Sequence, residues 1–494
     1  MKIVLINPRL RAWSPNIWVP LGLAYIAAVL EKEGHTIKII DMNEKKLNDD
    51  DLRANLKEDV DLVGITGMIT EYQKILRIID IAKDGFPDRK VILGGPLATT
   101  LPQQLLEQSK ADFIVIGEGE NTTPALIHAI EHGSDITKIR GIAYKKGEQI
   151  VINEPARQID NIDTIPFPAR YLLDMSKYIR NHFESFGFEI DGFDKIQSTN
   201  LTSSRGCPYN CTFCFKDMWG YKWRGRSAET IIAEMDLLND KYNVNGFFFV
   251  DDLFVLDKKR VFEFASLLRK SGLDVIWYCN GRANLMQKDM LKAMHDAGCI
   301  GIAYGIESGN QSILDLMKKN ITIDQAKSVV KWTKEIKIKA AGYFMIGMLG
   351  ETKETIMDTI NFAKELDLDF YGFSITTPLP GTELYTEAIK KGLIQTDMAS
   401  LKGWDFDINV NLTKDCTDGD LRTFKYKAFK EFTLKKQFGK YYMINPSFLR
   451  EGLKVVLLLR NREEAKEFAR NVSGIIKSYL NWNMRKTAGE GMLK

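Results

Sequence analysis

The chain has 494 residues, with 68 Lys and Arg against 65 Asp and Glu, which gives a net charge of +3. This length predicts about three domains, and the ordinary shares of hydrophobic residues (45%) and charged residues (27%) exclude a disordered or fibrous protein. No stretch approaches the ~18 consecutive apolar residues of a membrane-spanning helix, and the opening apolar run ends too early for a signal peptide, so we expect a cytoplasmic protein.

The first 140 residues alternate short apolar runs with helical patterns, which is typical of parallel strands joined by helices. One helix is predicted over residues 22–33, ended by Gly34, and another over residues 124–131, between Thr123 and Gly133. Five strands with such connections predict a doubly wound, Rossmann-like sheet of the flavodoxin type for residues 1–140. The predicted strands are 2–7, 36–41, 61–66, 90–95 and 112–117.

Glycine-rich segments follow the last two of these strands. They read Gly94-Gly95-Pro96 and Gly117-Glu118-Gly119-Glu120. Open parallel sheets bind ligands beyond the carboxyl ends of their strands, and glycines let a ligand approach the backbone closely. The sequence therefore predicts a ligand site at this edge of the sheet.

The rest of the chain predicts a linker, a second α/β domain and a helical end. Residues 141–195 read as a hairpin (141–153) and a proline-containing linker. Residues 196–417 predict a partial (β/α)6 barrel of the TIM type, with strands that end near 204, 251, 280, 308, 347 and 377. Residues 418–494 predict a basic helical domain, because the part from 421 onward contains 17 Lys and Arg against 6 Asp and Glu.

Three of the six cysteines lie together, directly after the first predicted barrel strand. Cys207, Cys211 and Cys214 have C-x3-C-x2-C spacing, with the aromatic Phe213 before the last one. Burial in an apolar core would not require this clustering. A zinc site would need a fourth ligand, and the sequence has no second cysteine pair. An iron-sulfur cube bound by three cysteines leaves one iron free for a small molecule, and we favour it over both alternatives.

This motif in this position resembles the radical S-adenosylmethionine (SAM) superfamily. The resemblance implies that the three cysteines bind a 4Fe-4S cluster, and that SAM chelates the free iron and is cleaved reductively to a 5′-deoxyadenosyl radical. Glu307 and Ser308 are expected to bond ribose hydroxyls. Arg282 is expected to pair with the carboxylate of SAM or, as a structural alternative, with a neighbouring acid. The residues so assigned to the cofactor are Phe213, Asp252, Arg282, Glu307 and Ser308; no catalytic side chain is assigned.

An open sheet ahead of such a barrel is similar to the cobalamin-binding members of this superfamily. The resemblance implies that glycines contact the nucleotide tail of cobalamin, and that its lower face rests after the third strand. The residues expected at this cofactor are Pro20, Leu21, Gly22, Thr66, Met68, Gly94, Gly95, Pro96, Gly117, Glu118, Gly119 and Glu120. The sequence has no D-x-H-x-x-G motif, which in other cobalamin enzymes brings a histidine to cobalt; a domain that has lost its cofactor is the alternative.

The two cofactors together imply methyl transfer to an unactivated carbon. Oxidative cyclisation, as in the anaerobic magnesium-protoporphyrin monomethyl ester cyclase, ring rearrangement and non-catalytic electron transfer are the alternatives. We expect an external electron donor of the flavodoxin or ferredoxin type and no nucleic acid partner. The substrate, whether small molecule, lipid or peptide, is not specified by the sequence. The basic C-terminal domain is expected to be a solvated helical cap, with peripheral membrane contact as the alternative.

Overall fold

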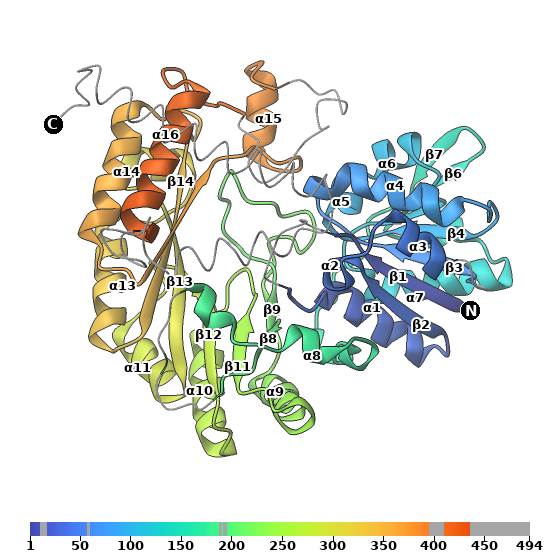
Figure 1. Ribbon diagram of the computed structural model, residues 1–494, viewed down its shortest axis with the longest axis horizontal. Helices are drawn as coiled ribbons and strands as arrows, with labels where there is room; N and C mark the ends of the chain where they lie inside the picture. Colours follow the sequence, from blue (N-terminus) through green and yellow to red (C-terminus); the bar gives the residue numbers. More distant parts are fainter. Residues whose placement is uncertain (10–16, 57–59, 187–189, 191–194, 395–409, 435–494) are drawn as a thin grey trace.

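The computed structural model describes residues 1–9, 17–56, 60–186, 190, 195–394 and 410–434. Two α/β units lie side by side in Figure 1, the N-terminal unit in blue and the barrel in green to orange. The N-terminal sheet has the strand order β2-β1-β3-β4-β5-β6-β7. Its first five strands pair in parallel, which confirms the flavodoxin-like sheet. These strands are β1 (Lys2–Asn7), β2 (Thr36–Asp41), β3 (Leu62–Ile65), β4 (Lys90–Leu93) and β5 (Phe113–Val115).

The predicted hairpin extends this same sheet. Strands β6 (Ile142–Lys146) and β7 (Gln149–Ile152) pair antiparallel with β5 and with each other, so the hairpin covers one edge. Because the central parallel strands are buried on both faces, their inner positions are apolar, whereas the edge strand β2 alternates with exposed polar residues. Helices α1 (Leu21–Lys32) and α7 (Gly119–His132) pack on one face. The other face is covered by α3 (Asp49–Asn55), α4 (Tyr72–Lys83), α5 (Gly95–Thr100) and α6 (Pro102–Gln108).

Helix α7 begins five residues earlier than the sequence predicts. Its first residue is Gly119, and Pro124 lies inside it. The prediction placed this proline at the start of the helix because proline is favoured there. The structure instead forms the first turn from the glycine-rich segment itself, so that Glu118 is the N-cap residue and Glu120 lies in the first turn.

The second sheet is the partial barrel. Its six strands are all parallel in the order β8-β11-β12-β13-β14-β15. They are β8 (Ser198–Leu201), β11 (Gly246–Phe249), β12 (Ile276–Gly281), β13 (Cys299–Glu307), β14 (Lys339–Ile346) and β15 (Phe370–Ile375). Helices α9 (Ala228–Tyr242), α10 (Lys258–Ser271), α11 (Lys288–Asp296), α13 (Ile323–Glu335) and α14 (Lys353–Glu365) cover its outer face (Figure 1). The sheet stays open between β8 and β15, which leaves room for the N-terminal unit beside it.

The described part of the C-terminal region packs onto the barrel. Helix α16 (Asp418–Ala428) continues into a π-helical turn at Phe429–Leu434, and Phe432 stacks on the rings of Tyr371 and Phe373 at centroid distances of 4.6 and 5.4 Å. This segment therefore completes the barrel core; the rest of the predicted basic domain lies outside the described residues. No helix in the described part of the chain is long and apolar enough to cross a membrane.

Several short elements complete the two units and their junction. They are α2 (Met42–Lys45), α8 (Met175–Tyr178), β9 (Ser204–Arg205), β10 (Arg224–Gly225), α12 (Gln311–Leu316) and α15 (Glu383–Lys390). The main chain of Val19, just before α1, makes two hydrogen bonds with the side chain of Asn200 on β8: the Val19 amide donates to Oδ1, and Nδ2 donates to the Val19 carbonyl. Trp18 stacks on the buried His182 with ring centroids 4.1 Å apart. The segment before α1 thus attaches the N-terminal unit to the first barrel strand.

Candidate active site

The cysteine motif lies in a loop with a narrow neck. Strands β9 and β10 pair antiparallel, with Arg205 opposite Arg224, so residues 206–223 project as one loop. Gly206 opens this loop with a φ of +81°, and a Cβ there would collide with the carbonyl of Lys222, so only glycine fits. The Thr212 amide also donates to the Met317 carbonyl at 3.0 Å. The neck and this hydrogen bond hold the loop against the carboxyl end of the barrel.

All three motif cysteines line one cavity of about 470 Å³. The other polar side chains in its wall come from the ends of strands β11 to β14 and from the loops beside them. They are Lys216, Asp252, Asn280, Arg282, Glu307, Lys319 and Tyr343. Among the described residues, no three His, Cys, Asp or Glu side chains are grouped closely enough to hold a single metal ion. Three thiolates on one cavity wall fit a polynuclear cluster, in which each binds a different iron, better than a zinc ion.

Lys216 brings a buried positive charge to the cysteines. Lys216 as a whole residue is 9% exposed. Burial works against the charge, but the neighbouring thiols of Cys214 and Cys207 and the carboxylate of Asp252 outweigh it and raise the pKa of Lys216. Burial also raises the pKa of Asp252, although Lys216 opposes this change. A cation and an acid therefore stand together beside the cluster position.

Arg282 contacts the cysteine loop and the chain beyond α12. Its guanidinium lies 3.6 Å from the ring centroid of Tyr209 and donates to the main-chain carbonyl of Lys319. Nη1 is 3.9 Å from the Sγ of Cys211, and Nε has no hydrogen-bond partner among the described residues. Of the two adjacent acids that were its alternative partners, Asp251 accepts hydrogen bonds from Ser203 and Ser204, and Asp252 lines the same cavity. Arg282 thus stands beside a motif cysteine, with a buried donor that has no hydrogen bond in the described part of the chain, and its contact with SAM remains a prediction.

The two residues predicted for the ribose point in different directions. Glu307 lines the cavity at the end of β13, where a register shift and a φ of +66° turn its side chain; such strain in a non-glycine residue is typical of functional sites. Its carboxylate is 2.6 Å from the Nζ of Lys319. Ser308 is fully buried, and its hydroxyl lies 3.0 Å from that of Thr359 on α14. Cofactor contacts for both residues remain predictions, and Ser308 is outside the cavity wall.

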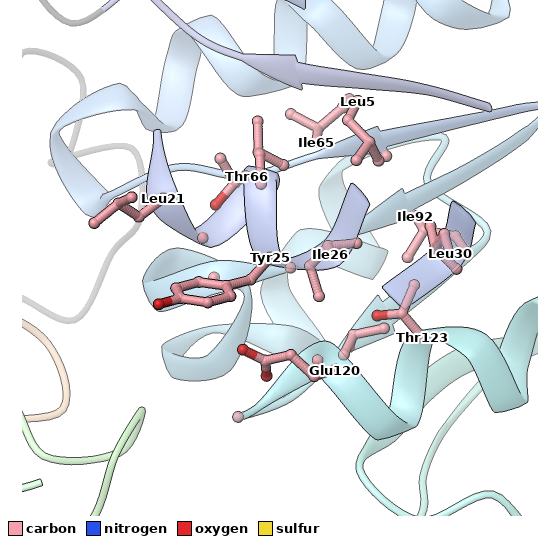
Figure 2. Close-up of a pocket in the computed structure, with 18 of the residues that line it drawn as sticks. Leu5, Leu21, Tyr25, Ile26, Leu30, Ile65, Thr66, Ile92, Glu120 and Thr123 are labelled. Carbon is pink, nitrogen blue, oxygen red and sulfur yellow. The ribbon is translucent and has the colours of Figure 1, made fainter. Parts of the chain in front are cut away.

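A second, apolar cavity lies in the N-terminal unit, between the sheet and helices α1 and α7 (Figure 2). Its volume is about 140 Å³. Apolar cavities of ~150 Å³ accept a benzene ring, so this one suits an aromatic ring of the cobalamin tail. In Figure 2, Leu5, Ile65 and Thr66 of the sheet edge face Tyr25 and Ile26 of α1 across the space.

Glycines shape this second cavity. Gly95 has a φ of +82°, and a Cβ there would collide with the hydroxyl of Thr66; a Cβ on Gly22, Gly94 or Gly117 would meet open space. Backbone is therefore exposed to a ligand, as the predicted cobalamin site requires. Of the residues predicted at cobalamin, the cavity wall includes Leu21, Gly22, Thr66, Gly94, Gly95, Gly117, Gly119 and Glu120. The remaining ones, Pro20, Met68, Pro96 and Glu118, are outside the wall, and their roles remain predictions.

The acids of the second glycine motif join the two units. Glu120 pairs with Arg205, and Glu118 lies 2.6 Å from a guanidinium nitrogen of Arg224. All four side chains are at most 6% exposed. These four residues were not predicted as partners from the sequence. A signal exists in retrospect, because the two arginines flank the cysteine motif at the start and end of one loop.

Other wall residues carry weaker sequence signals. Lys216 follows Cys214 by two positions and was detectable as part of the motif. Lys319 and Tyr343 were not, because nothing local distinguishes a lysine between helices or a tyrosine within a strand. Their functional position follows only from the barrel, which turns them into the cysteine cavity.

Comparisons with known proteins agree with this site. A B12 binding domain model matches residues 10–127, and a radical SAM superfamily model matches residues 201–363. An uncharacterized methyltransferase of Pyrococcus horikoshii is 36% identical over 404 residues, which cover 80% of this chain and 85% of that protein. The anaerobic magnesium-protoporphyrin IX monomethyl ester cyclase of Rubrivivax gelatinosus is 29% identical over 477 residues, which cover 92% and 83%. The cobalamin-dependent SAM radical enzyme OxsB with aqua-cobalamin has the same fold, with a TM-score of 0.71 at 16% identity, covering 98% of this chain and 79% of that one.

The chain therefore belongs to the cobalamin-dependent radical SAM methyltransferase family. Its cofactors are a 4Fe-4S cluster, SAM and cobalamin, and enzymes of this family need an external reductant. The three cysteines on one wall and the apolar, glycine-lined cavity are the features of this structure that fit the cluster and cobalamin.

Proposed function

We propose that this enzyme methylates an unactivated carbon atom of its substrate at the junction of the two units. One observation carries the proposal: the cysteine loop contributes to both cavities. Cys207, Cys211 and Cys214 line the polar cavity, while Met218 and Trp219 of the same loop line the apolar cavity. The sites for radical generation and for the methyl carrier are thus neighbours in space.

When bound, the cluster and SAM supply a radical that removes a hydrogen atom, and cobalamin supplies the methyl group. The residues of the chain hold and shield these groups. Cys207, Cys211 and Cys214 hold the cluster, and the Glu307–Lys319 pair and Asp252 offer hydrogen bonds to the polar parts of SAM. An aromatic core of strand and linker residues, which includes Phe183, Phe248 and Tyr278 with Trp18 packed beside them, fills the inner face of the barrel. It excludes water from that side of the site.

Oxidative cyclisation is the second candidate, because the cyclase of R. gelatinosus aligns over 92% of this chain. The relative with the higher identity is a methyltransferase, which favours methylation. The mass of the product separates the two, since methylation adds one carbon and two hydrogens whereas cyclisation adds oxygen or removes hydrogen.

The test is anaerobic reconstitution with iron, sulfide and hydroxocobalamin, followed by reaction with a reductant, SAM carrying a deuterated methyl group, and a metabolite extract. We expect 5′-deoxyadenosine, S-adenosylhomocysteine and a product that carries the labelled methyl group. The Cys207→Ala, Cys211→Ala, Cys214→Ala triple variant is the control and should form none of these. Enzyme that cleaves SAM but neither binds cobalamin nor transfers the label would refute the proposal.

We further propose a flavodoxin or ferredoxin as the electron donor. We also propose the cytoplasm as the compartment, because cluster thiolates require reducing conditions. Reduction of the cluster by a purified flavodoxin, followed by electron paramagnetic resonance, tests the donor. Peripheral membrane contact, the alternative for residues 418–494, stays a prediction: residues 418–434 pack on the barrel, and the rest of this domain lies outside the described residues. Co-sedimentation of the full chain with anionic vesicles tests it.

A further inference from the structure

The neck of the cysteine loop is clamped by the N-terminal unit. Arg205 and Arg224 are directly paired residues of β9 and β10, and between them lies the whole loop that carries the cysteines. Glu120 of α7 pairs with Arg205, while Glu118 pairs with Arg224 and lies 3.6 Å from Arg205. Two arginines and two glutamates therefore balance in charge across the junction.

This clamp is buried, so its geometry matters. The exposed fractions are 4% for the side chain of Arg205, 2% for that of Arg224, 3% for that of Glu118 and 6% for that of Glu120. Removing one partner of a buried ion pair destabilises a protein strongly, whereas breaking an exposed pair costs little. Neither glutamate can move away from the loop without leaving an arginine uncompensated.

The same loop also closes the apolar cavity. Arg205, Met218 and Trp219 belong to its wall, next to the residues of the sheet and of α1 and α7. The guanidinium carbon of Arg205 lies 4.5 Å from the ring centroid of Trp219, and Thr99 of α5 contacts the Met218 sulfur at 3.6 Å. A ligand in this cavity would therefore contact the same loop whose cysteines line the polar cavity.

One guanidinium nitrogen of Arg205 makes an ion pair but no hydrogen bond. Its Nη1 is buried and lies 3.6 Å from Oε1 of Glu118, and it has no hydrogen-bond partner among the described residues. A polar group on a ligand in this cavity, such as a phosphate or amide oxygen of a corrinoid, would remove that unsatisfied donor. Ligand binding would thus restrain Arg205, which lies two positions before Cys207, more firmly.

We propose that the Arg205 clamp couples the two cofactor sites: corrinoid binding stabilises the cysteine loop with its cluster, and a loaded cluster raises the affinity for the corrinoid by the same factor. Arg205 is the positioning residue of this coupling. The reciprocity follows from thermodynamic linkage. The inference rests on the proposed function, because it assumes that both cofactors bind to this chain.

The experiment measures hydroxocobalamin affinity anaerobically, by absorbance and equilibrium dialysis, for cluster-loaded wild type and for two cluster-free forms, unreconstituted wild type and the triple alanine variant. We expect affinity at least ~5-fold higher with the cluster, the lower end of typical coupling. In the reverse direction, hydroxocobalamin should slow release of iron to a chelator by a similar factor.

Two variants test the role of the clamp. Arg205→Lys keeps the charge but loses the planar fork, and Glu120→Gln keeps the shape but loses the charge. In both variants, the hydroxocobalamin affinity of the cluster-loaded protein should exceed that of the cluster-free protein by less than ~2-fold, which is outside the typical range of coupling. Lys222→Met is the matched control, because Lys222 lies in the same loop and its pair with Asp160 is exposed; its ratio should equal that of wild type.

The outcomes are distinguishable. Equal affinity with and without cluster overturns the coupling but leaves the proposed function intact, whereas loaded wild type that binds no corrinoid overturns the proposed function. If both folded clamp variants keep the wild-type ratio of hydroxocobalamin affinities with and without the cluster, the role of Arg205 is overturned. If Arg205→Lys fails to fold in a thermal melt, the milder Glu120→Gln decides the question.

Discussion

Filling the apolar cavity should weaken corrinoid binding strongly without destabilising the protein. Gly22 lies on α1, lines the cavity, and has only open space where a Cβ would stand. The series Gly22→Ala, Gly22→Val and Gly22→Leu places progressively larger side chains into the space that the cofactor tail would occupy.

The expected magnitudes follow from the cavity. An aromatic ring that buries about 150 Å² at about 25 cal/mol per Å² gains ~4 kcal/mol. Loss of this burial in Gly22→Leu should lower corrinoid affinity about a thousandfold. The free energy of unfolding should not fall, because replacing a helical glycine gains up to ~1 kcal/mol of helix propensity.

The assay combines an anaerobic hydroxocobalamin titration with thermal unfolding and iron analysis. Gly22→Ala should bind nearly as well as wild type, since it adds one methyl group. Lys32→Leu adds the same side chain as Gly22→Leu at an exposed position of α1 and should leave affinity unchanged. Wild-type affinity in Gly22→Leu would mean that the tail lies elsewhere.

Three further predictions concern the cluster, a buried charge triad and pH. The triple alanine variant of the motif cysteines should lose its iron and all SAM cleavage, as seen by iron assay and by chromatography of 5′-deoxyadenosine. Glu234 is fully buried between Arg170 and Arg226, so Glu234→Gln should lower the free energy of urea unfolding by ~3 kcal/mol or more, whereas Glu335→Gln in an exposed pair should not change it measurably. Burial raises the pKa of Glu71 to about 7, so the folded state binds this proton more tightly than the unfolded state does, and stability falls as pH rises from about 4.5 to 7. In unfolding experiments between pH 5 and pH 8, Glu71→Gln should remove up to ~3 kcal/mol of this fall in the free energy of unfolding.

Each of these has a contrary result. Iron retained by the triple variant would exclude the cysteines as its ligands. Equal stability of Glu234→Gln and wild type would show that the two arginines find other partners. Parallel stability curves for wild type and Glu71→Gln across the pH range would mean that the carboxyl of Glu71 keeps an ordinary pKa in the folded protein.

Much of the fold follows from local patterns. The five parallel strands of the first sheet and the six of the second are fixed by short apolar runs separated by helical periods, and both sheets form as predicted. The start of α7 was misplaced because Pro124 gives a strong local signal for a helix start. Packing of α7 on the sheet extends the helix through that proline, so tertiary contacts override the local preference.

The orientation of strand-end side chains was not predictable in the same way. Glu307 and Ser308 are adjacent, and a plain alternation would assign one of them to each face. Which one enters the cavity depends on the register shift of β13 against β14 and on the positive φ of Glu307. Both arise from the pairing of neighbouring strands, which a single sequence does not display.

The sequence alone brought together the three cysteines that we predict to bind the cluster, because all three lie in one loop and their spacing needs no distant partner. It also determined the glycine-lined ends of the first sheet. Only the tertiary structure decided how the two sites meet, since Arg205 is 85 residues from its partner Glu120. A buried charge is stabilised by whatever opposite charge the folding of both units brings within reach, and that choice depends on packing across the whole molecule.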